Sequence, residues 1–257
     1  PQGLFFFRFG AGSVRAMNKP SLAVVVPMLN EEDNVDPLLD QIVAATTSIP
    51  LKEIIFVNDG STDKTLEKML AAKKRAPALR IVSHSQRCGQ STGVATGVRF
   101  ATADAIVTLD GDGHNDPADI PQMYELYSAQ KSACFIGGQR FNRMDTPMKK
   151  LSSKIANRVR NAMLKDGSRD SGCGIKMFPR EVFLRLPFFN HMHRFMPALM
   201  KREGVTMLYM TVNARPRMTG TSKYGFWDRL WVGIVDLFGV AWLARRGPKP
   251  NVTCKEE

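Results

Sequence analysis

The sequence predicts an α/β domain in which helices cover both faces of a mostly parallel sheet. Two observations support this fold class. Short apolar runs rich in valine and isoleucine alternate with segments of helical periodicity, and polar residues typical of ligand binding directly follow several of these runs. The chain has 257 residues, of which 44% are hydrophobic and 23% charged, so it can build a large core and is not a disordered chain.

Strands and helices are expected to alternate along the first half of the chain. The apolar runs place strands at residues 22–27, 53–58, 79–83, 105–110 and 133–137. Helical periodicity lies between them, at residues 35–47, 63–75, 90–101 and 119–130. In open sheets of this kind the ligand binds beyond the carboxyl ends of the strands, so the residues after each strand should carry the function.

The chain is expected to divide into four segments. These are a disordered or tag-like tail at residues 1–19, a main domain at 20–225, a helix at 226–246 and a flexible tail at 247–257. Met17 is a candidate natural start. The apolar run near the beginning is too short for the core of a signal peptide, which needs about 7 to 15 residues.

The helix near the end is broadly apolar and carries one polar stripe. Residues 230–244 are apolar apart from Asp236, and this run is shorter than the roughly 20 residues that a spanning helix needs. We therefore expect the helix to lie in a membrane interface, with Arg245 and Arg246 at anionic head groups. A helix in the core or at an interface between copies of the chain is an equally weighted alternative.

The charge of the chain is unevenly distributed. The formal net charge is +12, and eleven Lys or Arg against three Asp lie between Arg140 and Arg180. Such a local excess favours a face for one particular anion over a nucleic-acid-binding surface, and no nucleic-acid-binding motif accompanies it. The four cysteines show no Cys-x-x-Cys spacing, so neither a disulfide framework nor a zinc site is indicated and a reducing cytoplasm fits best.

A pair of carboxylates follows the fourth expected strand. Asp110 and Asp112 are separated by one glycine, and His114 comes two residues later. Two carboxylates at this spacing can turn toward one hard cation that bridges a diphosphate, and His114 could complete the ligand set. A surface turn is the alternative interpretation. No Gly-x-Gly-x-x-Gly turn and no P-loop follows any strand, which disfavours both classical modes of phosphate binding.

Asp59 follows the second expected strand. We interpret it as the acceptor for an N–H group of a nucleoside base, with Ser61 and Asp63 ordering the loop. The alternative is that this segment only starts a helix, since residues of these types are common at helix N-termini.

Together these motifs resemble those of the family 2 glycosyltransferases. The resemblance rests on Pro27-x-x-Asn30-Glu31, on Val57 to Asp63, and on Asp110-x-Asp112 followed by Asp116-Pro117, and it extends from about Leu22 to Trp242. It is closest to the polyprenyl-phosphate sugar transferases of the dolichol-phosphate mannose synthase type.

This resemblance implies a GT-A (Rossmann-like) fold and a sugar donor linked to GDP or UDP. It further implies Mg²⁺ or Mn²⁺, and transfer with inversion to a polyprenyl phosphate, dolichyl or undecaprenyl, by an enzyme bound peripherally to the cytoplasmic face of the membrane. The motifs determine neither the base nor the sugar nor the length of the lipid.

The resemblance also assigns roles on the donor side. Pro27, Asn30, Glu31 and Asp59 would bind the nucleoside. Asp110 and Asp112 would bind metal and diphosphate, whereas His114 stands where the family commonly has Gln. Arg217, Ser222 and Lys223 match a loop that closes over the diphosphate, where the two cations would offset charge on the departing nucleotide.

On the acceptor side, Arg140 matches a family arginine near the acceptor phosphate, and Lys149 and Ser153 fall where a cation and a serine are expected. Helical periodicity over residues 148–163 places Lys149, Ser153, Asn157 and Arg160 on one face. The opposite, core-facing stripe would be formed by Met148, Leu151, Ile155, Val159 and Ala162. A solvated basic face is the alternative.

The expected mechanism is a direct in-line displacement. A phosphate monoester is already anionic at neutral pH, so the acceptor needs alignment by Arg140, Lys149 and Ser153 rather than a protein base. The metal site at Asp110 and Asp112 would stabilise the leaving diphosphate. The rival is a family 2 enzyme with a sugar or glycan acceptor in polysaccharide or lipopolysaccharide synthesis, for which Asp116 is the candidate base.

Two further motifs are not expected to be reactive centres. Cys173 stands at a serine of the family pattern and is expected to line the pocket of the sugar or acceptor. His191 and His193 are expected to lie on a helix, where residues two apart point about 200° apart and cannot share a metal ion.

Overall fold

The structure is a computed structural model that describes residues 19–140, 158–213, 215 and 226–246. Within residues 226–232 it describes only the backbone. The expected tails at 1–19 and 247–257 therefore lie almost wholly outside the described residues.

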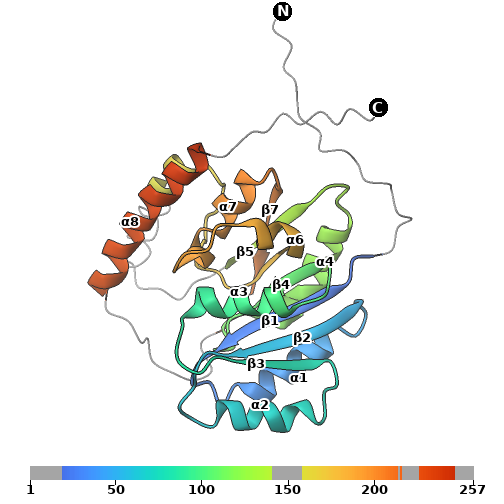
Figure 1. The fold of residues 1–257 in the computed structure, drawn as a ribbon. Coiled ribbons are helices and arrows are strands. Elements are labelled where there is room, and N and C mark those ends of the chain that lie inside the picture. Colours follow the sequence, from blue (N-terminus) through green and yellow to red (C-terminus); the bar gives the residue numbers. More distant parts are fainter. Residues whose placement is uncertain (1–18, 141–157, 214, 216–225, 247–257) are drawn as a thin grey trace, which may run out of the picture.

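A seven-stranded sheet forms the centre of the described chain (Figure 1). Its strands follow the order β3-β2-β1-β4-β6-β5-β7. Their bounds are β1 Leu22–Met28, β2 Leu51–Asn58, β3 Leu79–Ser83, β4 Ala105–Thr108, β5 Cys134–Arg140, β6 Lys176–Pro179 and β7 Thr206–Val212. Only β6 runs antiparallel to its neighbours, so the expectation of a mostly parallel sheet is confirmed.

The strands are built from residues that suit a sheet covered on both sides. In β1, six of the seven residues are buried, and they are mainly valine, leucine and alanine. Near-continuous apolar runs of this kind are typical of parallel strands buried on both faces. All five strands expected from the sequence are present, whereas β6 and β7 were not expected.

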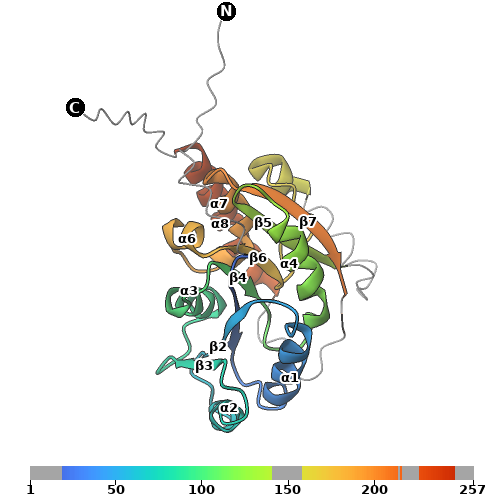
Figure 2. The ribbon, with the colours of Figure 1, turned by 90° about the vertical axis from the view of Figure 1, so that its right-hand side faces the viewer.

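Helices lie on both sides of the sheet (Figure 2). The first four are α1 Val35–Ala45, α2 Thr65–Lys73, α3 Gln90–Phe100 and α4 Ile120–Ser128, the last preceded by the 3₁₀ helix η1 Pro117–Asp119. A further helix covers residues 158–164, followed by α6 Arg180–Arg185, the 3₁₀ helix η2 Met192–Arg194, α7 Met196–Arg202 and α8 Phe226–Arg245. All four helices expected between the strands are confirmed.

Two apolar clusters fill the space between sheet and helices. One joins the sheet to α1, α2 and α4, and it includes Leu39, Met69 and Met123. The other joins the opposite face to α3, α6, α7 and α8, and it includes Phe178 and Val240. The sheet thus separates two hydrophobic cores, and packing on both faces holds the ends of the strands in place.

The helix at residues 158–164 buries a different face than the sequence predicted. Val159, expected in the core-facing stripe, is 49% exposed, while Arg160, expected on the polar face, is buried. Arg160 donates hydrogen bonds to both carboxylate oxygens of Asp166, and its guanidinium carbon lies 5.9 Å from the ring centre of Phe195. Helical periodicity could not reveal this, because the neutralising carboxylate comes from the loop after the helix.

Helix α8 packs on the second cluster through Val240 and Ala241. The described part of the chain contains no helix that is both long and apolar enough to cross a membrane. The polar residue Asp236 does not lie on the outer side of α8, since its carboxylate is 3.6 Å from the imidazole of His191.

Candidate active site

The parallel arrangement brings the ends of six strands to one edge of the sheet. Because β6 runs the other way, its first residue, Lys176, lies at this same edge. The polar residues that follow β1, β2 and β4 therefore lie at the same edge as Arg140, the last residue of β5, as the sequence predicted.

The loops after β1 and β2 are joined by hydrogen bonds. The backbone N–H of Asn30 donates to the Ser61 hydroxyl at 3.0 Å, and that of Glu31 donates to the Thr65 hydroxyl at 2.8 Å. Asn30 has a positive φ of 53°, a backbone conformation that asparagine tolerates better than most residues. Its side-chain oxygen accepts the N–H of Thr62 at 2.8 Å, which holds the turn in place.

Asp63 orders the start of α2. Its carboxylate accepts hydrogen bonds from the N–H and hydroxyl of Thr65 and from the N–H of Glu32. Burial alone would raise the pKa of Asp63, but these hydrogen bonds outweigh it and hold the pKa below the usual value. The ionised carboxylate of Asp63 thus stabilises the loop that contains Asp59.

The Asp59 side chain is buried and has several hydrogen-bond partners. Oδ1 accepts the N–H of Cys88 at 2.9 Å and lies 2.8 Å from Nδ1 of His84, and Oδ2 accepts the N–H of Gly89 at 2.8 Å. A carboxylate offers about four acceptor positions, so these contacts leave capacity for one more donor, on Oδ2. The structure therefore gives Asp59 a fixed position, and its contact with a base remains a prediction.

Asp110 lies just after β4 and is held by two neighbours. Its Oδ1 accepts a 2.7 Å hydrogen bond from Nε2 of Gln90, the first residue of α3, and its N–H donates to Oδ1 of Asn115. Gly174 passes so close that a Cβ on it would fall 2.2 Å from Oδ2 of Asp110. Gly174 belongs to the segment 170–174 that was expected to line the pocket, whereas Gln90 was not expected in the site, because only the folded chain brings α3 to Asp110.

Asp112 and His114 are half-buried in the same loop. Oδ1 of Asp112 accepts the N–H of His114 at 3.1 Å, which shapes the turn. In the described residues, one group of three metal-ligand side chains has its ligand atoms within 4.8 Å of one another, and it does not include Asp110, Asp112 or His114. These three side chains are therefore farther apart than that. Two carboxylates still fit Mg²⁺, which commonly binds one or two carboxylates and takes its other ligands from phosphate and water.

Arg140 ends β5 and forms a bidentate ion pair with Asp170. Nε donates to Oδ2 at 2.7 Å, and Nη2 donates to Oδ1 at 2.8 Å. Burial alone would lower the pKa of Arg140, but the paired carboxylate raises it well above the usual value. Arg140 is thus permanently charged and fixed in direction beside Asp110, and its third nitrogen, Nη1, takes no part in this pair.

Lys176 is a buried lysine that sequence reasoning missed. Its ammonium group donates to the carbonyl oxygen of Cys173, and its charge interacts with those of Asp110, Asp170 and Arg140. Burial lowers the pKa of Lys176. No short motif marks this residue, because its place in the site follows from the antiparallel insertion of β6.

Cys173 is buried beside this cluster. Burial raises the pKa of its thiol to about 11, so the group is a neutral thiol at pH 7. This agrees with the expectation that Cys173 is not a nucleophile.

The segment after β7 is attached to the loop that carries the carboxylates. Arg215 forms an ion pair with Asp116 at 2.6 Å, and its N–H donates to the carbonyl of His114 at 3.2 Å. The carboxylate of Asp119 accepts the N–H of Asn213 at 2.9 Å. Arg215 was not identified from the sequence, yet it lies two residues before Arg217.

Residues 148–157 of the expected helix at 148–163 lie outside the described part of the chain, and so do five of the predicted site residues. These five are Lys149, Ser153, Arg217, Ser222 and Lys223. Their assignments therefore stay predictions.

His191 and His193 have separate partners. Nδ1 of His193 lies 2.7 Å from the hydroxyl of Ser91, whereas Nδ1 of His191 lies 3.6 Å from Asp236. His191 has a left-handed backbone conformation and precedes the short 3₁₀ helix η2. The expectation that both histidines lie on an α-helix is therefore wrong. Burial lowers the pKa of His193 well below its usual value, which makes it a neutral structural residue.

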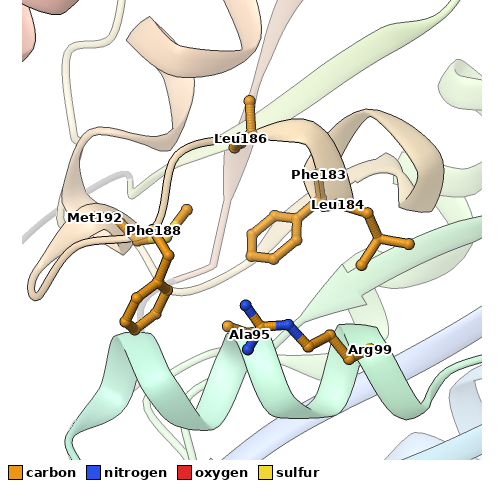
Figure 3. Close-up of a pocket in the computed structure, with 7 residues that line it drawn as sticks. All are labelled: Ala95, Arg99, Phe183, Leu184, Leu186, Phe188 and Met192. Atoms are coloured by element: carbon orange, nitrogen blue, oxygen red, sulfur yellow. The ribbon is translucent and has the colours of Figure 1, made fainter.

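A small hollow lies between α3 and the α6 region, at a distance from this site. Figure 3 shows Arg99 lying along α3 below Phe183 and Phe188. The guanidinium carbon of Arg99 is 5.8 Å from the ring centre of Phe188. Because Arg99 follows Gln90 by nine residues, the two lie about 13 Å apart along the helix axis, and the hollow is not part of the candidate site.

Comparison with known proteins agrees with this geometry. The profile of the family described as Glycosyl transferase family 2 matches residues 23–186. A dodecaprenyl-phosphate galacturonate synthase of Rhizobium johnstonii is 32% identical over 93% of this chain and 72% of the relative. An undecaprenyl-phosphate 4-deoxy-4-formamido-L-arabinose transferase of Pectobacterium carotovorum is 31% identical over 80% of this chain, which spans 63% of that relative.

The fold also matches solved structures. The glucosyl-3-phosphoglycerate synthase of Mycobacterium tuberculosis, solved with Mn²⁺, UDP and glucosyl-3-phosphoglycerate, superposes with a TM-score of 0.68. The match covers 92% of this chain and 84% of that chain at 17% sequence identity. This confirms the GT-A fold that the resemblance implied.

Proposed function

Because this chain belongs to glycosyl transferase family 2 and is a glycosyltransferase, we propose that it transfers a sugar from a nucleotide-sugar donor to a polyprenyl phosphate. The observation that carries the proposal is the meeting of two charged groups at one edge of the sheet. Asp110 and Asp112 lie on one side of this edge, and the Arg140–Asp170 pair lies on the other.

The donor half of the site would bind the nucleotide. Asn30, Glu31 and Asp59 stand on loops that hydrogen bonds hold in place, which favours binding without a large ordering cost. Asp110 and Asp112 would hold Mg²⁺ or Mn²⁺, which when bound supplies positive charge to the leaving diphosphate. Support for such an ion comes from the Mn²⁺ and UDP in the structure of the mycobacterial synthase, which shares the fold.

The acceptor half would bind an anionic phosphate through Arg140. A guanidinium that is fixed by a bidentate carboxylate can direct its remaining N–H groups at a second anion without reorienting. Lys149 and Ser153 would complete this half. The acceptor phosphate needs no deprotonation, so the chain's task is to align it with the anomeric carbon.

The structure disfavours the rival with a glycan acceptor, for which Asp116 would serve as the base. Oδ1 of Asp116 already accepts the N–H of Ala118 at 2.9 Å and pairs with Arg215 at 2.6 Å. The Asp116 carboxylate thus already has two partners, a backbone N–H at the start of a helix and an arginine, before any acceptor binds.

A transfer assay tests the reaction. Radiolabelled GDP- and UDP-sugars would be incubated with a short polyprenyl phosphate, with and without Mg²⁺ or Mn²⁺, and the lipid extracted into organic solvent. Metal-dependent label in the organic phase supports the proposal and names the donor. Donor consumption only in the presence of added glycans would show that the acceptor assignment is wrong.

A lipid acceptor requires the enzyme to work at a membrane surface, and α8 supplies a suitable face. Its outer side exposes Val235, Phe238 and Trp242 by 57%, 63% and 59%. The helix ends at Arg245, and the guanidinium of Arg246 lies 5.7 Å from the Trp242 ring centre. Aromatic residues beside arginines suit the head-group region of an anionic bilayer.

Vesicle binding tests this placement. We expect the protein to co-sediment with anionic vesicles and the double variant Phe238→Ala, Trp242→Ala to bind at least tenfold more weakly. Leu70→Ala, which removes an exposed leucine from α2, is the matched control. Unchanged vesicle binding in the double variant, with a smaller oligomer in solution, would instead assign the face to a second copy of the chain.

A further inference from the structure

Three metal-ligand side chains converge outside the loop of Asp110 and Asp112. Asp59 follows β2, while His84 and Cys88 lie in the segment that joins β3 to α3. A carboxylate oxygen, an imidazole nitrogen and the thiol sulfur of these residues lie within 4.8 Å of one another. Among the residues that the structure describes, no other trio of such atoms is gathered so closely.

The two loops that carry these residues are locked together. The carboxylate of Asp59 accepts the N–H groups of Cys88 and Gly89 at 2.9 and 2.8 Å. A Cβ on Gly60 would fall 2.4 Å from the carbonyl carbon of Gln86, so the two backbones are in direct contact there. The donor atoms are thus held near one another before any ion binds, which lowers the ordering cost of binding.

His84 is oriented as metal-binding histidines usually are. Its Nδ1 faces Asp59 at 2.8 Å, and its Nε2 lies 3.0 Å from the hydroxyl of Thr96. Histidine ligands in proteins commonly have their second nitrogen held by such a partner, which fixes the ring. With an ion on Nδ1, Nε2 carries the ring proton and donates it to Thr96.

Cys88 gives this cluster its chemical character. Its thiol is exposed, and its sulfur lies 3.3 Å from the carbonyl oxygen of Gln86. Tetrahedral Zn²⁺ needs ligand atoms about 3.3 to 3.6 Å apart, so the three donor atoms, which lie within 4.8 Å of one another, would adjust their positions when the ion binds. Thiolate and imidazole ligands select Zn²⁺ over Mg²⁺, which prefers oxygen ligands.

We propose that Asp59, His84 and Cys88 form a Zn²⁺ site whose fourth position is open to water or another ligand. The thiol proton is released when the ion binds, because the ligand is the thiolate. The site shares Asp59 with the nucleoside pocket of the proposed function. On that basis, bound Zn²⁺ excludes the donor nucleotide and inhibits the enzyme in competition with it, whereas Mg²⁺ at Asp110 and Asp112 supports the reaction.

Cobalt binding tests the site without any assay of activity. Co²⁺ replaces Zn²⁺ at such sites and gives a thiolate charge-transfer absorption that carboxylate ligands do not produce. We expect this absorption in the full chain at one equivalent of Co²⁺, with displacement by Zn²⁺. It should be lost in Cys88→Ser and retained in Cys254→Ser, the matched control. His84→Gln should bind Co²⁺ at least tenfold more weakly, with an unchanged circular dichroism spectrum.

Two results would overturn the site. One is the absence of the thiolate band in the wild-type chain, and the other is its persistence in Cys88→Ser. A separate titration measures whether Zn²⁺ raises the KM for the nucleotide-sugar without changing kcat. If Zn²⁺ binds through Cys88 but leaves this KM unchanged, the proposed competition with the donor is wrong. The metal site itself would then be supported independently of the proposed function.

Discussion

The side-chain amide of Gln90 donates a 2.7 Å hydrogen bond to Oδ1 of Asp110. This bond joins the first turn of α3 to the end of β4, so it fixes a carboxylate of the proposed metal site from a different element. A hydrogen bond to a charged group contributes about 1.5 to 3 kcal/mol.

Gln90→Ala should therefore weaken binding of donor and metal roughly tenfold, corresponding to about 1.4 kcal/mol, and affect kcat less. Steady-state kinetics at varied Mg²⁺ or Mn²⁺ would measure this. Gln130→Ala is the matched control, since Nε2 of Gln130 donates to the carbonyl of Leu126 in α4. Equal kinetics for Gln90→Ala and the wild type would show that Asp110 is held by other contacts in the active complex.

Asp112→Ala should reduce turnover at least a hundredfold without unfolding the protein. The hydrogen bond that Oδ1 of Asp112 accepts is local, from the N–H of His114, so its loss costs little stability. Asp112→Asn should fail as well, because the amide lacks the charge that a divalent cation requires. Thermal denaturation monitors the fold, and Asp36→Asn, which removes a surface partner of Arg75, serves as the control. Activity near the wild-type level would contradict the metal assignment.

Gly174→Ala should lower activity at least tenfold by displacing Asp110. The added Cβ would fall 2.2 Å from Oδ2 of Asp110 and 2.5 Å from Oδ1 of Asn115, so both side chains or the backbone of residue 174 must move. Gly233→Ala in α8 is the control, since a Cβ there meets no atom within 4 Å. A Gly174→Ala enzyme with an unchanged KM for the metal would show that the site absorbs the methyl group.

The alternation of short apolar runs with helical segments was sufficient to predict the first five strands and the four helices between them. It missed β6, which is four residues long and includes the charged Lys176. β4 is equally short but is an apolar run that ends in threonine, whereas β6 begins with a lysine and ends with a proline, so no apolar run marks it. Its position between β4 and β5 also depends on pairing with residues about forty to seventy positions away, which no local pattern encodes.

The positions of Asp59 and Asp110 could be predicted because each directly follows a strand, while their roles stay predictions. The candidate site could not be predicted where a residue acts through a distant partner. Arg140 was expected to meet a substrate anion, but its pairing with Asp170, thirty residues away, could not be read from any local pattern. The proximity of Cys88 to Asp59 was equally hidden, because the two residues lie 29 positions apart and no regular cysteine spacing marks them.

Glu53 provides the pH-dependent prediction. Its buried carboxylate accepts the N–H and hydroxyl of Thr102 and pairs with Arg80. Burial alone would raise the pKa of Glu53, but these contacts outweigh it and lower the pKa below the usual value of 4.5. A carboxyl group whose pKa is depressed by folding stabilises the folded state above its unfolded pKa, and this stabilisation is lost as the pH falls through the folded value.

Glu53→Gln should accordingly lower the free energy of unfolding at pH 7 and make the protein less sensitive to acid below about pH 4.5. Urea denaturation between pH 3 and pH 7 would show a smaller loss of stability on acidification in the variant than in the wild type. Glu67→Gln, on the exposed side of α2, is the control and should follow the wild-type curve. Parallel curves for Glu53→Gln and the wild type would mean that the Glu53 carboxylate has the same proton affinity in the folded and unfolded chains.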